Sequence, residues 1–376
     1  MRVIIAGGGT GGHLFSGLAI AEEFKSRDIK TEIIFVGTEY GIEAKVIPRE
    51  GYPIKFLRAE GIVGISLTRK IKALAKMVMS ASDSYEIIQD VKPDIMIGVG
   101  GYASGVIMLI ASLISIPTII IEQNCIPGFT NRILGKFVKT VCIAYQESIP
   151  YFPKGKTYLT GNPVRMNILR GNTESGYELF SLEKNLFTIF VFGGSLGARS
   201  INNAVIESLN YLQDFKKDIQ FLHQTGKEDY ERVRSSYRNL GFKGTIAPFI
   251  FEMGEAYAVS DLVISRAGAT TLAEITALGK PAILIPYPYA TGHHQELNAM
   301  KLLEMGAAKV IRSSELSGES LSNTIRILFE NEALRAEMQK NSRALGRPDA
   351  SVRVVDIAMS ILKNKMIKTY SGKQSV

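Results

Sequence analysis

Two glycine-rich turns have the residue types best suited to holding a phosphate. Residues 3–13 read VIIAGGGTGGH and residues 187–197 read FTIFVFGGSLG, and each apolar run breaks into glycines before a helical pattern begins. Glycine lets the backbone turn sharply and come close to a ligand, and the helix that follows offers N–H groups and a partial positive charge. The sequence therefore predicts a phosphate-binding turn in each half of the chain.

The first turn ends in a histidine. Gly7, Gly9 and Gly12 match G-x-G-x-x-G, but the second strand lacks an acid at the place where a dinucleotide fingerprint needs one. His13 lies at the mouth of the turn, where an imidazole can take a proton from an alcohol or orient a phosphate. A purely structural histidine is the alternative interpretation.

Further polar residues follow apolar strands. Glu122, Gln123 and Asn124 come directly after a run of β-branched residues, which indicates either a ligand site or a helix cap and turn. Arg165 follows the sequence GNPV and either reaches a phosphate or lies on the surface.

The stretch SRAGATTLAE, residues 265–274, is the most informative one in the second half. A strand ends at Ser265, Gly268 turns the chain, and a helix begins near Ala269, whose first N–H groups suit a pyrophosphate. Glu274 can accept the two hydroxyls of a ribose, unless it is an ordinary surface glutamate. His294 and Gln295, after a long polar loop, can bond to sugar hydroxyls, and the adjacent His293 and His294 lack the spacing of a zinc site.

Two absences in the sequence narrow the chemistry. The second turn lacks the GK[ST] ending of a P-loop, which disfavours an ATPase, and the chain contains no Asp-x-Asp. A metal-dependent sugar transferase normally uses that motif to hold a divalent ion against a diphosphate. We therefore expect neither a metal nor a cofactor. If the protein is a sugar transferase, helix N-termini and arginine must stabilise the leaving diphosphate instead.

These residues lie between alternating strand and helix patterns. Strands are predicted at Val3–Ala6, Glu32–Val36, Ile54–Leu57, Ile95–Val99, Thr118–Ile121, Val141–Ala144, Thr188–Phe192, Ile219–His223, Ile246–Phe249, Leu262–Ile264 and Ala282–Pro286. Helices between them include Leu14–Lys25, Ser104–Ser115, Ser200–Leu209, Thr270–Leu278 and His294–Glu304. This alternation predicts an α/β fold of two doubly wound, Rossmann-like domains that face each other across a cleft, with ligands beyond the carboxyl ends of the strands.

Length and composition fit this architecture. A chain of 376 residues is too long for one ordinary core. We expect an N-terminal domain over 1–163, a C-terminal domain over 164–345, and a helix and tail over 346–376 that pack back on the first domain, with the connection within 161–187. The apolar stretch 103–121 predicts a buried helix and strand rather than a membrane span, because Pro117 divides it. No signal peptide is expected, and the two cysteines lack metal spacing.

Seven motifs occur in one order between about residues 3 and 345: GGGTGGH, GGYASG, EQN, GNPVR, GGSLGAR, SRAGATTLAE and HHQELNA. In this ordered set the chain resembles the MurG family, the bacterial transferases that add N-acetylglucosamine to lipid I to make lipid II in peptidoglycan synthesis. The resemblance implies the two-domain B-type glycosyltransferase fold. It also implies attack of the acceptor's C4 hydroxyl on C1 of the sugar with inversion, while UDP leaves.

The resemblance also implies roles for individual residues. His13 or Glu122 would be the general base. The residues that would bind UDP-N-acetylglucosamine are Thr10, Gly11, Gly12, Asn124, Arg165, Ser195, Ile250, Ala269, Thr270, Thr271, Leu272, Ala273, Glu274, His294 and Gln295. Two positions depart from the family: Ser16 replaces a common proline, and Ile121 replaces a common histidine, which removes one alternative base.

A basic segment suits a membrane surface. Residues 61–82 contain Arg69, Lys70, Lys72 and Lys76 and no acid, with apolar residues at helical spacing. Such a pattern can dock on an anionic bilayer, although a core helix with a solvated basic face is the alternative. With the resemblance, it implies a peripheral protein on the cytoplasmic face of the cell (inner) membrane. Its expected partners are lipid I, UDP-N-acetylglucosamine and other proteins of cell-wall synthesis and division, and not nucleic acid.

Two other functions remain open on the sequence. One is a glycolipid-forming transferase with a diacylglycerol acceptor, which would share the glycine signatures. The other is a non-catalytic module that binds a nucleotide sugar or a dinucleotide. The net charge of +8 by itself fits nucleic acid, an anionic membrane surface or anionic substrates, but it also fits a basic surface without a partner.

Overall fold

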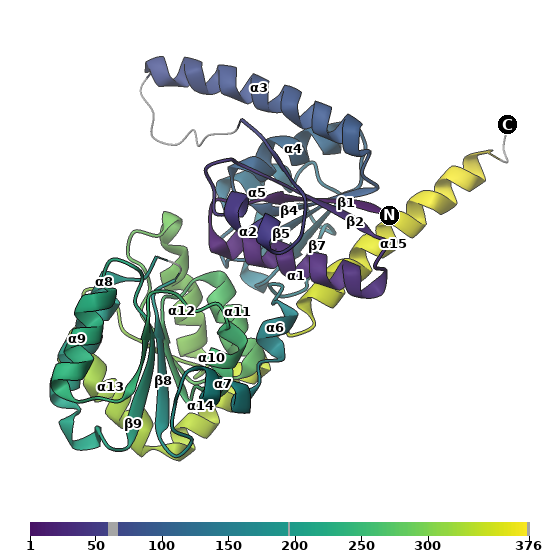
Figure 1. Cartoon of the computed structure of the whole chain (residues 1–376). Helices are drawn as coiled ribbons and strands as arrows, with labels where there is room; N and C mark the ends of the chain where they lie inside the picture. Colours follow the sequence, from purple (N-terminus) through teal and green to yellow (C-terminus); the bar gives the residue numbers. More distant parts are fainter. Residues whose placement is uncertain (59–66, 195, 374–376) are drawn as a thin grey trace. The chain divides into compact units, whose positions relative to one another are not determined.

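The computed structural model contains two compact α/β domains. It describes residues 1–58, 67–194 and 196–373, and for residues 67–78, 102, 291 and 366–373 it describes the backbone alone. The N-terminal domain comprises Met1–Arg165 and Asp349–Val376, and the C-terminal domain comprises Met166–Pro348. Each domain has one parallel sheet with helices on both faces (Figure 1). The predicted pair of Rossmann-like domains is thereby confirmed.

The N-terminal domain has a seven-stranded parallel sheet. Its strands are β1 (Arg2–Gly7), β2 (Glu32–Gly37), β3 (Ile54–Phe56), β4 (Ile95–Gly100), β5 (Thr118–Glu122), β6 (Thr140–Ile143) and β7 (Thr157–Leu159). Its helices are α1 (Gly11–Arg27), α2 (Glu43–Arg49), α3 (Leu67–Val91), α4 (Tyr102–Leu113), α5 (Phe129–Leu134), the 3-10 helix η1 (Gln146–Tyr151) and α15 (Ala350–Lys373). The strand order is β3-β2-β1-β4-β5-β6-β7, so the order reverses next to β1.

The C-terminal domain repeats this plan with six parallel strands. They are β8 (Phe187–Phe192), β9 (Ile219–Gln224), β10 (Gly244–Ala247), β11 (Leu262–Ser265), β12 (Ala282–Leu284) and β13 (Lys309–Val310), in the order β10-β9-β8-β11-β12-β13. The helices are α6 (Met166–Leu169), α7 (Thr173–Leu179), α8 (Arg199–Tyr211), η2 (Gln213–Phe215), α9 (Tyr230–Leu240), α10 (Met253–Val259), α11 (Ala269–Leu278), η3 (Thr291–His293), α12 (His294–Glu304), α13 (Gly318–Glu330) and α14 (Glu332–Leu345).

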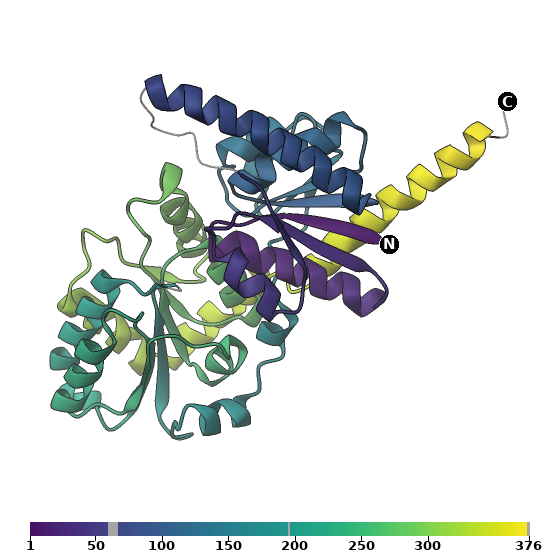
Figure 2. The same cartoon turned by 45° about the horizontal axis from the view of Figure 1, so that its top comes forward.

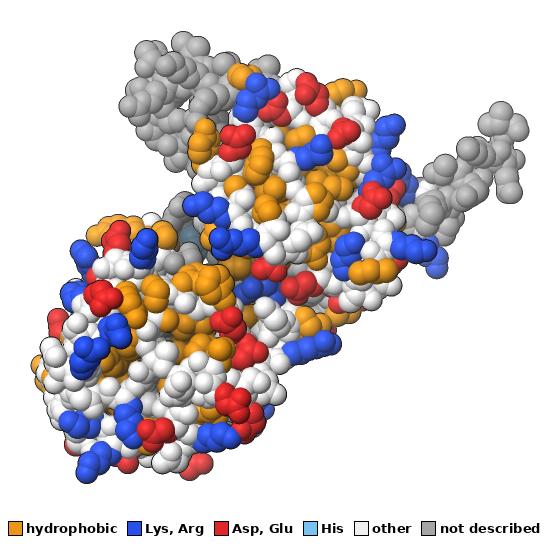
Figure 3. Space-filling model, in the orientation of Figure 1, with side chains coloured by type: hydrophobic (Ala, Val, Ile, Leu, Met, Phe, Trp, Pro, Cys, Tyr) orange, Lys and Arg blue, Asp and Glu red, His pale blue; other side chains and the backbone are white. Residues whose placement is uncertain are grey.

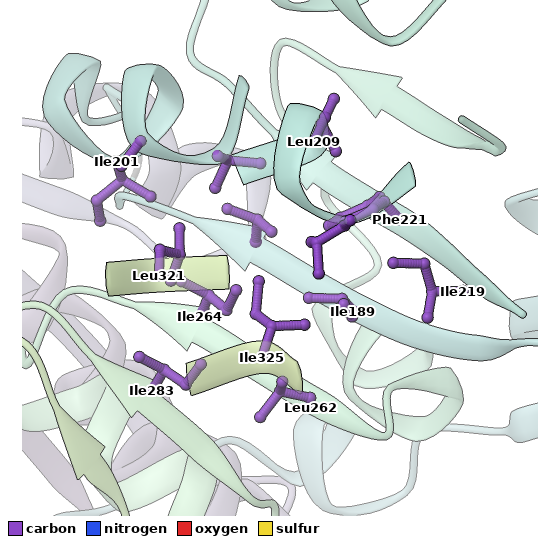
Figure 4. Close-up of a cluster of buried hydrophobic side chains, with 14 of the residues drawn as sticks. Ile189, Ile201, Leu209, Ile219, Phe221, Leu262, Ile264, Ile283, Leu321 and Ile325 are labelled. Carbon is purple, nitrogen blue, oxygen red and sulfur yellow. The ribbon is translucent and has the colours of Figure 1, made fainter. Parts of the chain in front are cut away.

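Side chains along each strand point alternately to the two faces of the sheet, and helices pack against both faces. In β8, Ile189 and Val191 point to one face, where they pack with residues of α8 and α13 such as Leu209 and Ile325 (Figure 4). On the opposite face, Phe190 contacts Tyr257 of α10 edge-on, with ring centroids 5.6 Å apart. Because both faces are covered, the strands are mostly apolar, as is usual in parallel sheets, and the few polar residues within them, such as His223 of β9, are buried.

Helix α15 returns from the end of the chain to the first sheet. Val354 and Ala358 are buried in the same core cluster as Leu18 of α1. Arg27 of α1 pairs with Asp356 at 2.6 Å. Figures 1 and 2 both show the yellow α15 beside the purple α1. The last helix therefore completes the core of the N-terminal domain.

The strands and helices predicted between residues 3 and 304 are confirmed to within about three residues at their ends. The last helix, α15, was expected to end at Lys363 but continues to Lys373, through most of the predicted tail. The predicted strands omit β7 and β13, because these short strands lie at sheet edges and are only partly buried. The connection expected within 161–187 contains α6 and α7, which pack against α10. The stretch 103–121 is α4 followed by β5, as predicted.

The surface mixes charges of both signs. On the face in Figure 3, basic and acidic side chains are interspersed among the described residues of both domains. Within the described ranges, no helix combines the length and apolar composition that crossing a bilayer requires.

A buried histidine gives the C-terminal domain a predictable pH dependence. His223 is fully buried, and its two ring nitrogens contact Asn202 Oδ1 at 3.0 Å and the Tyr237 hydroxyl at 3.2 Å. Burial lowers the pKa of His223 from 6.5 to about 3. The unfolded chain therefore binds the proton first, and stability is lost as the pH falls from about 6.5 towards 3.

We expect this group to cost on the order of 4 kcal/mol of unfolding free energy at pH 3 relative to pH 7. Chemical denaturation of the wild type and of His223→Gln between pH 7 and pH 4 measures it. The variant lacks the titrating ring, so its stability should fall less over this range. Equal losses in the two proteins would contradict the assignment.

Candidate functional site

The carboxyl edge of the N-terminal sheet gathers the predicted residues of that domain. β1 ends at Gly7, α1 begins at Gly11, and Thr10 is the exposed N-cap residue. The N–H of Gly8 donates to the carbonyl oxygen of Gly100 at 3.3 Å, which joins the first turn to the end of β4. A Cβ added at Gly101, whose φ is +83°, would lie 2.4 Å from the Gly8 oxygen. The turn after β4 can therefore approach the turn after β1 this closely only with glycine at position 101.

His13 lies half-buried on the first turn of α1, beside the glycine turn. Its Nδ1 is 3.3 Å from the carbonyl oxygen of Gly8 and 3.3 Å from Thr10 Oγ1. A carbonyl oxygen only accepts, so a hydrogen bond from the neutral ring to Gly8 places the proton on Nδ1, whereas the Thr10 hydroxyl can donate to that nitrogen or accept from it. Gly100 makes room for the ring, because a Cβ there would lie 2.8 Å from His13 Nε2. The Nδ1-protonated tautomer is the form in which a general base acts through the lone pair on Nε2.

Glu122 is the buried last residue of β5 and is 1% exposed. One of its oxygens accepts from the backbone N–H and side-chain amide of Asn124 at 3.0 and 3.2 Å. The other accepts from Gly128 N–H at 3.2 Å and from Asn131 at 2.9 Å. Burial raises the pKa of Glu122, and these hydrogen bonds oppose the rise. The carboxyl group thus holds the loop that contains Asn124.

Arg165 ends the first segment of the N-terminal domain. Its guanidinium lies over the ring of Phe15, 4.1 Å from the centroid. Its Nε is buried without a hydrogen-bond partner among the described residues. Nearby in the same domain, Ser16 Oγ lies 3.0 Å from Gly12 O and 2.8 Å from Asn162 Oδ1, and its one proton is shared between these two acceptors. The serine that departs from the family pattern therefore fastens α1 to the GNPVR segment.

The carboxyl edge of the C-terminal sheet gathers the other predicted residues. α8 begins at Arg199 after the turn that follows β8, and α11 begins at Ala269 with Gly268 as its N-cap. The N-terminal N–H groups of a helix have no partner within it, and no cap side chain competes for those of α11 because the cap is glycine. The predicted residues Ala269, Thr270, Thr271, Leu272 and Ala273 form this first part of α11. The arrangement suits an anion.

Glu274 is 6% exposed and is oriented by a buried tyrosine. The Tyr257 hydroxyl donates to Glu274 Oε2 at 2.9 Å, and Tyr257 itself is fully buried. Glu274 is therefore not an ordinary surface glutamate. The sequence did not reveal Tyr257, since one tyrosine in an apolar helical pattern carries no signal of such a role.

Gln224 joins two of the predicted loops. This last residue of β9 is 3% exposed, its Nε2 donates to Gly194 O at 2.9 Å, and its Oε1 accepts from Ile250 N–H at 2.8 Å. One buried amide thereby sets the distance between the glycine turn after β8 and Ile250, one of the residues predicted to bind the nucleotide sugar. Gln224 follows His223 rather than an apolar residue, so the sequence carried no signal for this role.

Of the remaining predicted residues, the structure describes the side chains of His294 and Gln295 but not those of Ser195 and the basic residues of α3. His294 and Gln295 begin α12, where both are half-buried, and Gln295 Oε1 accepts from Tyr287 N–H at 3.0 Å. Ser195 lies outside the described residues. Helix α3 includes Arg69, Lys70, Lys72 and Lys76, whose side chains also lie outside the described ones. Within the described residues, no group of His, Cys, Asp or Glu could hold a metal ion.

Comparisons with known proteins identify the family. The glycosyltransferase family 28 N-terminal domain matches residues 3–143 and the family 28 C-terminal domain matches residues 188–354. The chain is 52% identical over 365 residues to the UDP-N-acetylglucosamine–N-acetylmuramyl-(pentapeptide) pyrophosphoryl-undecaprenol N-acetylglucosamine transferase of Thermodesulfovibrio yellowstonii, covering 97% of this chain and 100% of the relative. The chain belongs to this transferase family.

Two further members of the family support the assignment. The transferase of the same name from Myxococcus xanthus is 46% identical, with 96% of this chain and 93% of the relative covered. The crystal structure of Acinetobacter baumannii MurG matches with a TM-score of 0.75 at 28% identity, covering 96% and 99% of the two chains. The protein is therefore a glycosyltransferase of the MurG family, and the predicted fold and enzyme class are confirmed.

The bridge formed by Gln224 gives a prediction that does not depend on catalysis. In Gln224→Met the side chain keeps a similar volume but loses both hydrogen bonds, so the amide of Ile250 should exchange with solvent about tenfold faster. Hydrogen exchange followed by mass spectrometry on a peptide spanning residues 247–253 measures this. Gln213→Met, at an exposed position, is the matched control, and unchanged exchange in Gln224→Met would contradict the bridge.

Proposed function

We propose that the protein transfers N-acetylglucosamine from UDP-N-acetylglucosamine to the C4 hydroxyl of N-acetylmuramic acid in lipid I, which forms lipid II and UDP. The similarity to named transferases over nearly the whole length of both chains carries this proposal. The muramyl acceptor appears in the names of these relatives, which favours it over a diacylglycerol acceptor. Because the chain belongs to a transferase family, we favour an enzyme over the alternative of a non-catalytic module that binds a nucleotide sugar or a dinucleotide.

The donor binds to the C-terminal domain in this proposal. The N-termini of α8 and α11 stabilise the diphosphate, whose negative charge grows as UDP leaves. Ser195 contacts the diphosphate, Glu274 binds the ribose hydroxyls, and Ile250 frames the uracil. His294 and Gln295 lie at the start of α12, from which they bind the sugar. The buried position of Glu274 and its bond from Tyr257 support the ribose assignment, because the carboxylate is oriented before the ligand arrives.

The acceptor side belongs to the N-terminal domain. Thr10, Gly11, Gly12 and Asn124 approach the sugar and the acceptor, and Arg165 completes the site. His13 is the general base: the C4 oxygen forms a bond to C1, its proton passes to His13 Nε2, and the C1–O bond breaks with its electron pair leaving on UDP. We prefer His13 to Glu122, because Glu122 is buried and both of its oxygens already accept hydrogen bonds.

The transfer assay uses UDP-N-acetylglucosamine radiolabelled in the sugar and a short-chain analogue of lipid I, with and without EDTA. We expect label in the product under both conditions. Lack of transfer to the muramyl acceptor in the folded protein would overturn the proposed acceptor, and dependence on a divalent ion would overturn the role of the helix N-termini.

The ribose contact is tested by two variants in the same assay. Glu274→Ala should raise KM for UDP-N-acetylglucosamine by about tenfold or more, and Tyr257→Phe should raise it by about fivefold, because a hydrogen bond to a charged group contributes roughly 1.5–3 kcal/mol. KM for the acceptor should not change in either variant. Wild-type affinity for the donor in Glu274→Ala would remove Glu274 from the ribose site.

The protein acts at the cytoplasmic face of the cell membrane in this proposal, as a peripheral protein docked through α3. Each cation near an anionic bilayer contributes about 1 kcal/mol. Changing Lys70, Lys72 and Lys76 together to glutamate should therefore reduce binding to anionic lipid vesicles by at least about a hundredfold in a sedimentation assay. Association with other proteins of cell-wall synthesis and division belongs to the same proposal.

The matched control changes Lys217, Lys227 and Lys340 of the C-terminal domain to glutamate, which alters the net charge by the same amount. This control should bind vesicles like the wild type. Intact vesicle binding in the α3 variant, or an equal loss in the control, would count against α3 as the docking segment.

A further inference from the structure

One peptide group connects His13 to a buried carboxylate. The carbonyl oxygen of Gly8 is the acceptor for His13 Nδ1 at 3.3 Å. The N–H of the same peptide group, which belongs to Gly9, donates to Glu43 Oε2 at 2.8 Å. Because a peptide group is planar and rigid, the two contacts are joined through one unit, with the carboxylate at one end and the imidazole at the other.

Glu43 is built into the fold as an acceptor. It is the first residue of α2 and is 1% exposed. Besides Gly9, it accepts from the backbone N–H and the hydroxyl of Thr38, both at 2.9 Å from Oε1. Three donors converge on its two oxygens, the arrangement that suits an ionised carboxylate, which only accepts.

The backbone around this carboxylate leaves no room for other side chains. A Cβ added at Gly8, Gly37 or Gly41 would lie 2.2, 2.5 or 2.1 Å from an atom of Glu43. These glycines come from three places: the turn after β1, the end of β2 and the loop before α2. Three segments of backbone therefore enclose the Glu43 side chain. Capping the N-terminus of α2 would not by itself require contacts from all three.

We propose that Glu43 is a positioning residue for His13. It fixes the orientation of the Gly8–Gly9 peptide group, so that the Gly8 carbonyl keeps the proton of His13 on Nδ1 and the lone pair on Nε2. The negative charge also polarises the peptide group and makes the Gly8 oxygen a stronger acceptor. The inference rests on the proposed function only in taking His13 as the group that accepts the proton, and Glu43 touches no reacting atom.

The central test is Glu43→Gln in the full-length protein. Two backbone N–H groups, of Gly9 and Thr38, face the two oxygens, and an amide offers only one oxygen, so one of them loses its acceptor whichever way the amide turns. The first measurement is the nitrogen NMR spectrum of the imidazoles in protein labelled at histidine. The chain has four histidines, and the spectrum of His13→Gln assigns the signal of His13.

We expect the neutral ring of His13 to be protonated on Nδ1 in the wild type and to move towards the Nε2-protonated form in Glu43→Gln. In the transfer assay kcat should fall by about tenfold, a part of what a general base contributes, while KM for UDP-N-acetylglucosamine stays within about twofold. Glu39→Gln is the matched control, since Glu39 is an exposed glutamate four residues away, and both readouts should be unchanged there.

The outcomes separate this inference from the proposed function. An unchanged tautomer in folded Glu43→Gln overturns the positioning role, whether or not activity falls. Full kcat in His13→Gln overturns the base, while a tautomer shift in Glu43→Gln would still establish the coupling. If Glu43→Gln does not fold, Thr38→Val removes one donor to Glu43 and should cause a smaller shift in the same direction. An unchanged tautomer and kcat in Thr38→Val then overturn the proposal.

Discussion

All strands in each sheet run parallel, so their carboxyl ends lie along one edge of the sheet, and the turns that follow them lie there too. Each turn that leads into a helix also brings the helix N-terminus to that edge, with N–H groups that need an acceptor. The positions of the glycine turns, of the polar residues at the ends of β5 and β9, and of the start of α11 all follow from this constraint. Ligand-binding chemistry can be added to such an edge without disturbing the apolar layers beneath it.

Buried polar side chains hold the turns in place. Glu43 accepts from the turn after β1, Glu122 from the loop after β5, and Gln224 connects the turn after β8 to Ile250. Each of the three is 1–3% exposed, so its hydrogen bonds do not compete with water. A glycine-rich turn has little intrinsic preference for one conformation, and these side chains supply the restraint that glycine lacks. In both domains, flexible backbone is paired with a rigid buried acceptor or donor.

Both domains hold their glycine-rich turns with buried side chains, but these side chains differ in charge. The N-terminal domain uses carboxylates, which accept from the backbone N–H groups of Gly9 and Gly128. The C-terminal domain uses the neutral amide of Gln224 beside the turn that we propose to bind a diphosphate. A carboxylate at that place would repel the ligand, whereas beside His13 it supports a group that accepts a proton. Glu274 is a buried carboxylate in the C-terminal domain. We propose that it contacts ribose hydroxyls rather than phosphate, so its charge does not oppose binding of the diphosphate.

The sequence by itself determined the layers, most strand and helix positions, and the family, because apolar periodicity and the order of motifs are local properties of the chain. It also indicated that Glu122 and Glu274 were candidate site residues. Glu122 directly follows a run of β-branched residues, and Glu274 lies in the helix that begins after the turn at Gly268. Only the tertiary structure decided which residues hold these turns. Glu43, Gln224 and Tyr257 carry no pattern of their own, and their partners lie 34, 30 and 17 residues away along the chain. A hydrogen bond between distant segments depends on strand order and burial, which exist only once the chain has folded.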